Sequence, residues 1–179
     1  DKVGAAVIGT GNIFWEEASD PQFNDFVVSA EAKPNGTGGA GLVYLFAGTD
    51  GVKPKALSDA AAKIRYTGNA YHYFGRALAV GDFDNSGVND LVIGTASDEA
   101  YLFWGPLQEN QNFTPSNTLD ETDADVHFED VYGTKAGAVL AGVGDFDGDN
   151  SEDLLIGATD GGQAAHGAAY LFLDVAMLT

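Results

Sequence analysis

Apolar residues occur along this chain in short runs that are separated by glycine, asparagine and aspartate. The runs at 91–94 and 154–157 are typical, because both are aliphatic and end in glycine. A short apolar run bounded by turn-forming residues indicates a buried strand. Rough alternation of apolar and polar residues predicts further strands at 62–66 and 125–131. The pattern therefore favours an all-β fold made of short antiparallel strands.

The order of the predicted strands repeats along the chain. Each of two units has a lead-in strand, a polar loop, an aliphatic strand and an aromatic strand, at 73–81, 82–90, 91–94 and 100–104 and again at 136–144, 145–153, 154–157 and 168–172. The two loops begin 63 residues apart, at Asp82 and Asp145. A period of this length is typical of arrays of supersecondary units such as propeller blades.

A third, degenerate copy of the repeat lies upstream of these two units. Its lead-in at 3–11 matches that of the last unit, because glycines stand seven residues apart in both. The segments 25–30 and 41–46 stand where the aliphatic and aromatic strands belong. Together with the fourth strands at 62–66 and 125–131, the repeat predicts four-stranded blades of a β-propeller.

The chain is therefore interpreted as one propeller-type domain over residues 1–179. We place its three repeats at approximately 1–69, 70–131 and 132–179. The last repeat has only 175–179 as a candidate for its fourth strand, so it is the one that can be incomplete.

The two polar loops carry oxygen-bearing side chains at loop positions one, three, five and nine. These residues are Asp82, Asp84, Ser86 and Asp90 in the first loop, and Asp145, Asp147, Asp149 and Asp153 in the second. A tight turn with alternate side chains pointing inward places such groups around one point, and the backbone carbonyl at position seven, from Val88 or Ser151, adds an oxygen. Calcium takes about six to eight oxygen ligands of this kind. The loops therefore predict two bound calcium ions.

Aspartate, asparagine and glycine also form turns without a metal, and one such loop alone would not decide between the two interpretations. Two copies with the same spacing and the same flanking residues favour metal binding. The degenerate first copy has instead a loop at 12–25, which is five residues longer than the other two loops and lacks the carboxylates at positions one, three and five. We expect no calcium in that loop, and we expect Phe14 and Trp15 to project into a contact.

Several short motifs match one known repeat family. They are Phe74-Gly75, the Gly-Asp-Phe-Asp openings at 81–84 and 144–147, and the stretches 94–96 and 157–159 at the place of Gly-Ala-Pro. With these motifs the chain resembles the FG-GAP repeat family, which occurs in integrin α-subunit propellers and in many bacterial and fungal surface proteins. No repeat has the proline of the name motif, and the last has Ala136-Gly137 in place of Phe-Gly.

The resemblance implies a calcium-stabilised module that is extracellular or at the cell surface and serves adhesion or protein–protein recognition. Two alternatives remain open, a glycan-binding lectin and a non-catalytic propeller segment of a larger secreted enzyme. Rings of the family close with about seven blades, which three units do not provide. We therefore expect either a segment of a longer polypeptide or a protomer that assembles with copies of itself or with a protein partner.

Charge and composition limit the classes of molecule that can be binding partners. The chain has 27 acidic and 8 basic residues, a formal net charge of −19, which two calcium ions would reduce to −15. Nucleic acid and anionic membranes are thereby disfavoured as partners. Cysteine is absent, so a metal would replace disulfides as the cross-link. No apolar run is long enough to insert into a membrane.

The sequence gives little support to catalysis. His72, His127 and His166 share no metal-ligand spacing, and no nucleophile elbow, phosphate loop or zinc signature is present. We therefore expect no enzyme activity. The aromatic residues at 71–73, together with Trp15, can form either a binding surface or simple packing between blades.

Overall fold

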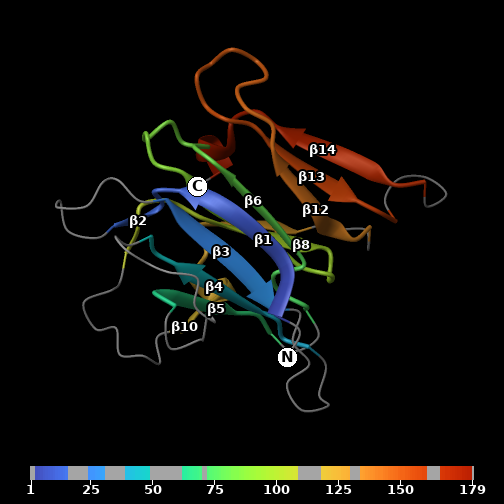
Figure 1. Cartoon of the computed structure of the whole chain (residues 1–179). Helices are drawn as coiled ribbons and strands as arrows, with labels where there is room; N and C mark the ends of the chain where they lie inside the picture. The colour runs from blue at the N-terminus through green and yellow to red at the C-terminus, as the bar shows by residue number, and fades with distance from the viewer. Residues whose placement is uncertain are drawn as a thin grey trace.

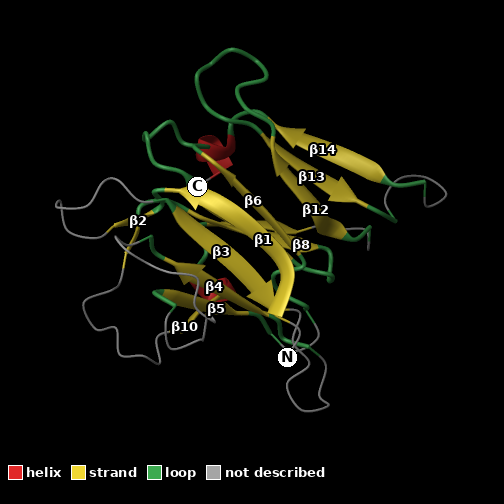
Figure 2. Cartoon of the chain, in the orientation of Figure 1, coloured by secondary structure: helices red, strands yellow, loops and turns green. Residues whose placement is uncertain are grey.

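The computed structural model describes residues 3–15, 24–30, 39–48, 62–69, 72–108, 118–129, 134–160 and 166–178. Within these ranges the regular structure consists of β-strands and two short 3-10 helices, with no α-helix (Figure 2). The predicted all-β, propeller-type fold is confirmed. Neither of the two short helices is long and apolar enough to cross a membrane.

The first sheet is an antiparallel meander with one added strand. Its strands are β1 (Val3–Gly11), β3 (Asp25–Ala30), β4 (Leu42–Phe46) and β5 (Ile64–Thr67), in that spatial order. A fifth strand, β10 (Thr118–Asp120), pairs in parallel with β5. Because β10 lies inside the predicted second repeat but joins the first sheet, the sheets do not follow the predicted repeat limits in every strand.

The second and third sheets repeat the same meander. The second contains β6 (Ala77–Gly81), β7 (Asp90–Gly94), β8 (Glu99–Phe103) and β11 (Val126–Glu129), and the third contains β12 (Ala136–Gly142), β13 (Leu154–Ala158) and β14 (Ala168–Phe172). A separate pair joins β2 (Phe14–Trp15) to β9 (Leu107–Gln108) in parallel. The division into repeats at 1–69, 70–131 and 132–179 stays a prediction.

The expected fourth strand of the last repeat is wrong. In its place the chain forms the 3-10 helix η3 (Val175–Leu178), which begins with a turn in which the Met177 N–H donates to the Asp174 carbonyl. Val175 is fully buried against the core beneath the third sheet, whereas the next three residues are exposed. One buried side chain is enough to hold a single helical turn, and alternation over so short a segment could not distinguish the two structures.

The three sheets are arranged like successive propeller blades. Their first strands, β1, β6 and β12, lie side by side, and each meander runs outward from that line (Figure 1). One hydrophobic core lies between the first and second sheets and includes Phe74 and Leu78. A second core lies between the second and third sheets and includes Phe83 and Leu154. The described sheets form part of a ring and do not close it.

Glycines allow the second and third sheets to touch through their backbones. A Cβ atom added at Gly94 in β7 would lie 2.0 Å from the carbonyl oxygen of Gly137 in β12. A Cβ at Gly142 would lie 2.5 Å from the carbonyl oxygen of Val80 in β6. No real Cβ tolerates such distances, so any larger residue at these positions would push the two sheets apart.

Replacing Gly94 with alanine is expected to destabilise the chain. The added methyl group would meet backbone that cannot rotate away, which should lower the free energy of unfolding by about 3 kcal/mol. Gly9→Ala is a matched control in the single chain, because nothing lies within 4 Å of a Cβ there, and it should change the stability of the single chain by less than about 0.5 kcal/mol. Urea unfolding at low protein concentration measures both values, and equal stability of the two variants would contradict the close approach.

Candidate metal-binding loops

Each of the two predicted metal-binding loops joins the first strand of a sheet to its second strand. Loop one (residues 82–90) connects β6 to β7, and loop two (145–153) connects β12 to β13. Both loops have left-handed backbone at positions four and six, with φ of 56° at Asn85 and 85° at Gly87, and 87° at Gly148 and 77° at Asn150. Asparagine and glycine exchange places between the loops, yet the conformation is the same. These two residue types adopt positive φ most readily, so the residues at both positions allow this turn.

Backbone N–H groups hold the carboxylates of loop one inside the turn. The two oxygens of Asp82 accept from the N–H groups of Ser86 and Gly87, both at 2.9 Å. Oδ1 of Asp84 accepts from the Ser86 N–H, also at 2.9 Å. One oxygen from each of Asp82, Asp84 and Asp90 then lies within 4.8 Å of the others. Three carboxylates this close suit a hard divalent cation.

The remaining predicted ligands of loop one are also brought together. The Ser86 hydroxyl donates to the carbonyl oxygen of Val88 at 3.3 Å, so both oxygens lie on the same side of the turn. Burial raises the pKa of Asp90 to about 7, although hydrogen bonds from Gly105 and Phe83 oppose the shift, and nearby carboxylates raise it further. A bound cation would remove the repulsion among these carboxylates.

Loop two has the same internal hydrogen bonds in a more exposed setting. Oδ1 of Asp145 accepts from the N–H groups of Gly148 and Asp149, at 2.6 and 3.0 Å. Oδ1 of Asp149 accepts from the Ser151 N–H at 2.7 Å. One oxygen from each of Asp145, Asp147 and Asp149 lies within 4.8 Å of the others. Desolvation and the neighbouring carboxylates raise the pKa of Asp147.

The closing aspartate at position nine differs between the loops. Oδ2 of Asp90 accepts from the Phe83 N–H at 2.8 Å and its Oδ1 from the Gly105 N–H at 2.8 Å. Asp153 keeps the first bond, from the Phe146 N–H at 2.6 Å, but its buried Oδ1 has no hydrogen-bond partner. Asp153 also lies outside the three-carboxylate cluster of its loop. A buried oxygen without a donor leaves its lone pairs free for a cation, so loop two fits a metal as well.

The first sheet shows that the closing aspartate has a second role. Asp25 accepts from the Ile13 N–H at 2.9 Å and from the Gly48 N–H at 2.8 Å, the same pair of bonds that Asp90 makes. The loop of that sheet lacks the metal-loop pattern, and the aspartate there still ties strand ends through two backbone hydrogen bonds. In the third sheet the position that matches Gly48 is Asp174, where the chain turns toward η3, and this accounts for the missing donor at Asp153. The loop pattern in the sequence predicts only calcium ligation for Asp90 and Asp153, and it does not indicate this structural role.

The loop at 12–25 is only partly described, because 16–23 lie outside the described residues. Its described residues contribute to no group of three possible metal ligands, and the absence of calcium there stays a prediction. Phe14 and Trp15 pair through their backbones with β9 of the same chain. Their side chains are outside the described part, so the expected contact also stays a prediction.

The two metal-binding loops are attached to the sheet that precedes each of them. At position eight of loop one, the Asn89 side chain donates to the Thr10 carbonyl at the end of β1, at 3.0 Å. At position eight of loop two, the Glu152 N–H donates to the carbonyl of Asp82, at 3.0 Å. An ion that orders either loop would therefore also support the junction between two sheets.

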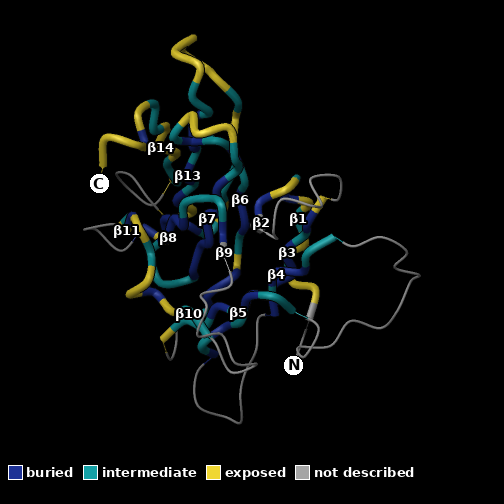
Figure 3. The backbone as a smooth tube through the Cα atoms, turned by 90° about the vertical axis from the view of Figure 1, so that its left-hand side faces the viewer, coloured by how far each residue is buried: buried dark blue, intermediate teal, exposed yellow. Residues whose placement is uncertain are grey.

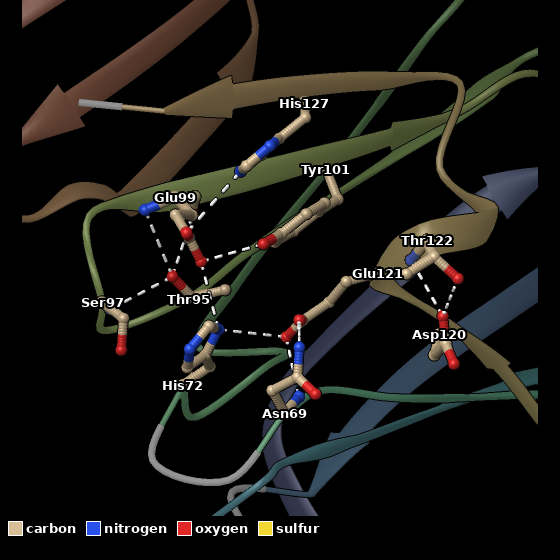
Figure 4. Close-up of polar contacts among 10 residues, drawn as sticks. All are labelled: Asn69, His72, Thr95, Ser97, Glu99, Tyr101, Asp120, Glu121, Thr122 and His127. Atoms are coloured by element: carbon tan, nitrogen blue, oxygen red, sulfur yellow. Dashed lines mark hydrogen bonds and ion pairs between the residues drawn. The ribbon is translucent and has the colours of Figure 1, made fainter. Parts of the chain in front are cut away.

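A separate polar cluster, which no sequence motif predicted, lies beside β8 (Figure 4). Nδ1 of His72 is 3.1 Å from Glu99 and 3.2 Å from the buried Glu121, and the Tyr101 hydroxyl donates to Glu99 at 2.8 Å. His127 stacks on Tyr101, which agrees with a structural role for this histidine. The residues come from segments with unrelated spacing, so only the folded chain brings them together. The cluster links the start of the second sheet to η2 (Glu121–Asp123).

Fold and loops together define a propeller-type chain with two calcium-loop-like turns, and comparison with known proteins agrees. The chain is 30% identical over 100 residues to integrin alpha-4 of Xenopus laevis, which covers 56% of this chain and 10% of that protein. It is 29% identical over 161 residues to integrin alpha-5 of Xenopus laevis, covering 87% and 14%. It is 32% identical over 130 residues to human phosphatidylinositol-glycan-specific phospholipase D, covering 66% and 14%.

These relatives confirm the predicted resemblance to the integrin-like FG-GAP family. No protein-family model matches the chain. The aligned region spans only about a tenth to a seventh of the relatives' own lengths. Activities and partners of the whole relatives therefore come to this chain only as proposals.

Replacing Asp25 with alanine should destabilise the chain equally with and without calcium. Two backbone N–H groups would lose their acceptor, which should cost about 2–4 kcal/mol. Asn24→Ala, at the exposed neighbouring position, is the control and should stay within about 0.5 kcal/mol of the original chain. Urea unfolding in calcium and in chelator tests the expectation. A loss of stability that appears only in calcium would instead assign Asp25 to a metal site.

Proposed function

We propose that this chain is a calcium-stabilised extracellular module for adhesion or protein–protein recognition, without catalytic chemistry of its own. One observation carries the proposal: two loops with the same backbone conformation each gather three carboxylate oxygens within 4.8 Å. In loop one the calcium ligands are Asp82, Asp84, Ser86, Asp90 and the Val88 carbonyl. In loop two they are Asp145, Asp147, Asp149, Asp153 and the Ser151 carbonyl.

Electrostatics supports a cation at both loops. The chain carries a formal net charge of −19, and each loop concentrates carboxylates that repel one another. Calcium binds such oxygen clusters and stabilises the folded state that presents them. In the absence of cysteine, two ions would be the cross-links that hold strand ends together at the junctions between sheets.

The relatives support the recognition role and the location. Three of them are integrin alpha subunits, and the FG-GAP resemblance implies an extracellular or cell-surface adhesion module. The partner is then a protein, or further copies of the same chain. The strong negative charge disfavours nucleic acid and anionic membranes as partners.

A second candidate is a non-catalytic propeller segment of a larger secreted enzyme. The match to phosphatidylinositol-glycan-specific phospholipase D favours it. Both candidates give this chain a binding role, and both expect no hydrolysis of phosphatidylinositol-glycan by the chain itself. Glycan binding stays an untested prediction, for which a glycan array is the direct measurement.

The two calcium sites are expected to differ in affinity. Loop two offers four carboxylates, including the free oxygen of Asp153, whereas loop one offers three and the Ser86 hydroxyl. Because affinity rises with ligand charge, loop two should bind about tenfold more tightly. Calorimetric titration of the metal-free chain measures both events. Asp147→Ala should remove the tighter event and Asp82→Ala the weaker one.

A gain-of-function variant sharpens this test. Ser86→Asp gives loop one a fourth carboxylate and should bring its affinity close to that of loop two. Glu129→Ala, an exposed acidic residue of β11, is the control and should leave both events unchanged. Chelator should lower the melting temperature of the original chain. A single weak binding event, or a melting temperature that chelator does not change, would show that the loops are not calcium sites.

A further inference from the structure

The third sheet carries an open apolar groove of about 550 Å³ on the face that points away from the second sheet. Its lining includes Val139, Ala141, Leu155, Gly157 and Ala168, and no lining residue is charged. Such a surface is unusual in a chain with a formal net charge of −19. Apolar surface of this kind marks an interaction site more often than bare solvent-facing structure.

Equivalent positions on the second sheet are buried. Strand pairing sets the correspondence, because Gly94 pairs with Ala100 as Gly157 pairs with Ala169. Leu102 is fully buried, whereas its counterpart Leu171 is 40% exposed. Phe83 is fully buried, whereas its counterpart Phe146 is 71% exposed. Figure 3 shows the same contrast, with β7 and β8 largely buried and β14 exposed or half-buried. The difference is that the third sheet covers the second, and no described segment covers the third.

The cover on the second sheet is the first strand of the next sheet. β12 lies against β6, β7 and β8. A Cβ at Gly137 would lie 2.2 Å from the Glu99 carbonyl oxygen, and the Leu140 side chain lies against Gly94. The earlier junction repeats the arrangement, because Phe74, just before β6, forms a bridge with Gly41 beside β4. Both internal junctions are therefore built by the same element.

β1 has the features of such a covering strand, but no described sheet lies against its exposed face. Gly4 has φ of 95°, like Gly75 at 87° and Gly137 at 83°, yet nothing lies within 4 Å of a Cβ placed on Gly4. Val7 is 65% exposed, whereas its counterpart Leu78 is buried in the first core. The open part of this face is concentrated on β1, because Val28 and Phe46 of β3 and β4 are already buried.

We propose that β1 of a second copy of this chain docks into the groove over β12, β13 and β14, head to tail. By the internal junctions, Gly4 would lie against the Ala168 carbonyl, Val7 against Gly157, and Gly9 against Gly142. The inference rests on the self-association included in the proposed function and specifies its surface. Such a contact joins two different surfaces, so each assembly has a free β1 and a free groove at its ends unless the copies form a closed ring. Two copies bring six sheets together, close to the about seven blades of the family's rings and within the about four to eight blades of closed propellers, so a closed pair is the expected state.

Two single substitutions test the contact from its two sides. Val7→Glu places a charge on the docking strand, and Val139→Glu places one in the groove. Both residues are exposed in the single chain, at 65% and 56%, so both variants should fold. In calcium at micromolar concentration, light scattering should give about twice the single-chain mass of 18.6 kDa for the original chain and the single-chain mass for each variant. Met177→Glu, at an exposed residue that does not line the groove, should keep the pair.

Mixing the two variants distinguishes a contact between β1 and the groove from a contact of either surface with its own copy. The Val139→Glu chain retains an intact β1, and the Val7→Glu chain retains an intact groove, so the mixture should form pairs that neither variant forms alone. A single-chain mass for the original chain, no effect of Val7→Glu, or no recovery on mixing would each overturn the proposal. Calcium titration of both variants should be unchanged. If the original chain pairs but binds no calcium, the proposed function fails and this contact stands.

Discussion

The direct contact of backbone with backbone between successive sheets is the constraint on which this structure depends. Gly94 and Gly137 meet where neither could carry a side chain, and Gly142 meets Val80 in the same way. This contact sets the spacing of the two sheets, so the side chains between them must fill a narrow layer. Phe83 and Leu102 do so and are fully buried. The described sheets build this junction twice, once between the first and second sheets and once between the second and third.

The metal-binding loops contain two separable functions. The residues at positions one, three and five gather oxygens that backbone N–H groups hold in place. The sequence of the loop at 12–25 lacks carboxylates at these positions. The aspartate at position nine ties two backbone N–H groups in the first and second sheets. The first sheet therefore forms beside a loop whose sequence lacks the carboxylates at positions one, three and five. At the closing aspartate, a bound cation would share one side chain with the hydrogen bonds that hold the strand ends.

Most strands and both loops could be predicted from the sequence, because their signals are local. The run at 91–94 ends in glycine, and the spacing from Asp82 to Asp84 is visible in the chain itself. What could not be predicted depends on contacts between distant segments. β10 joins the first sheet across more than fifty residues, as Thr118 pairs with Arg65. The cluster around Glu99 and His72 has no spacing rule. The segment at 175–178 forms a helical turn with only Val175 buried, and the sequence alone does not show which residue of this apolar run enters the core.

Charge and architecture explain why the loops and the sheet junctions belong together. The chain is strongly acidic, and each of the loops that follow β6 and β12 gathers three carboxylate oxygens within 4.8 Å of one another. The Glu152 N–H, in loop two, bonds to the carbonyl of Asp82, in loop one, so the two carboxylate groups lie on neighbouring sheets that are joined directly. A cation at each loop would oppose the repulsion at the place where it is greatest, while the glycine contacts hold the sheets together along their length. The glycine contacts do not offset charge, and an ion at a loop would touch only the loop end of each sheet. Bound cations would therefore offset charge within the two loops, where three carboxylates lie close together in each.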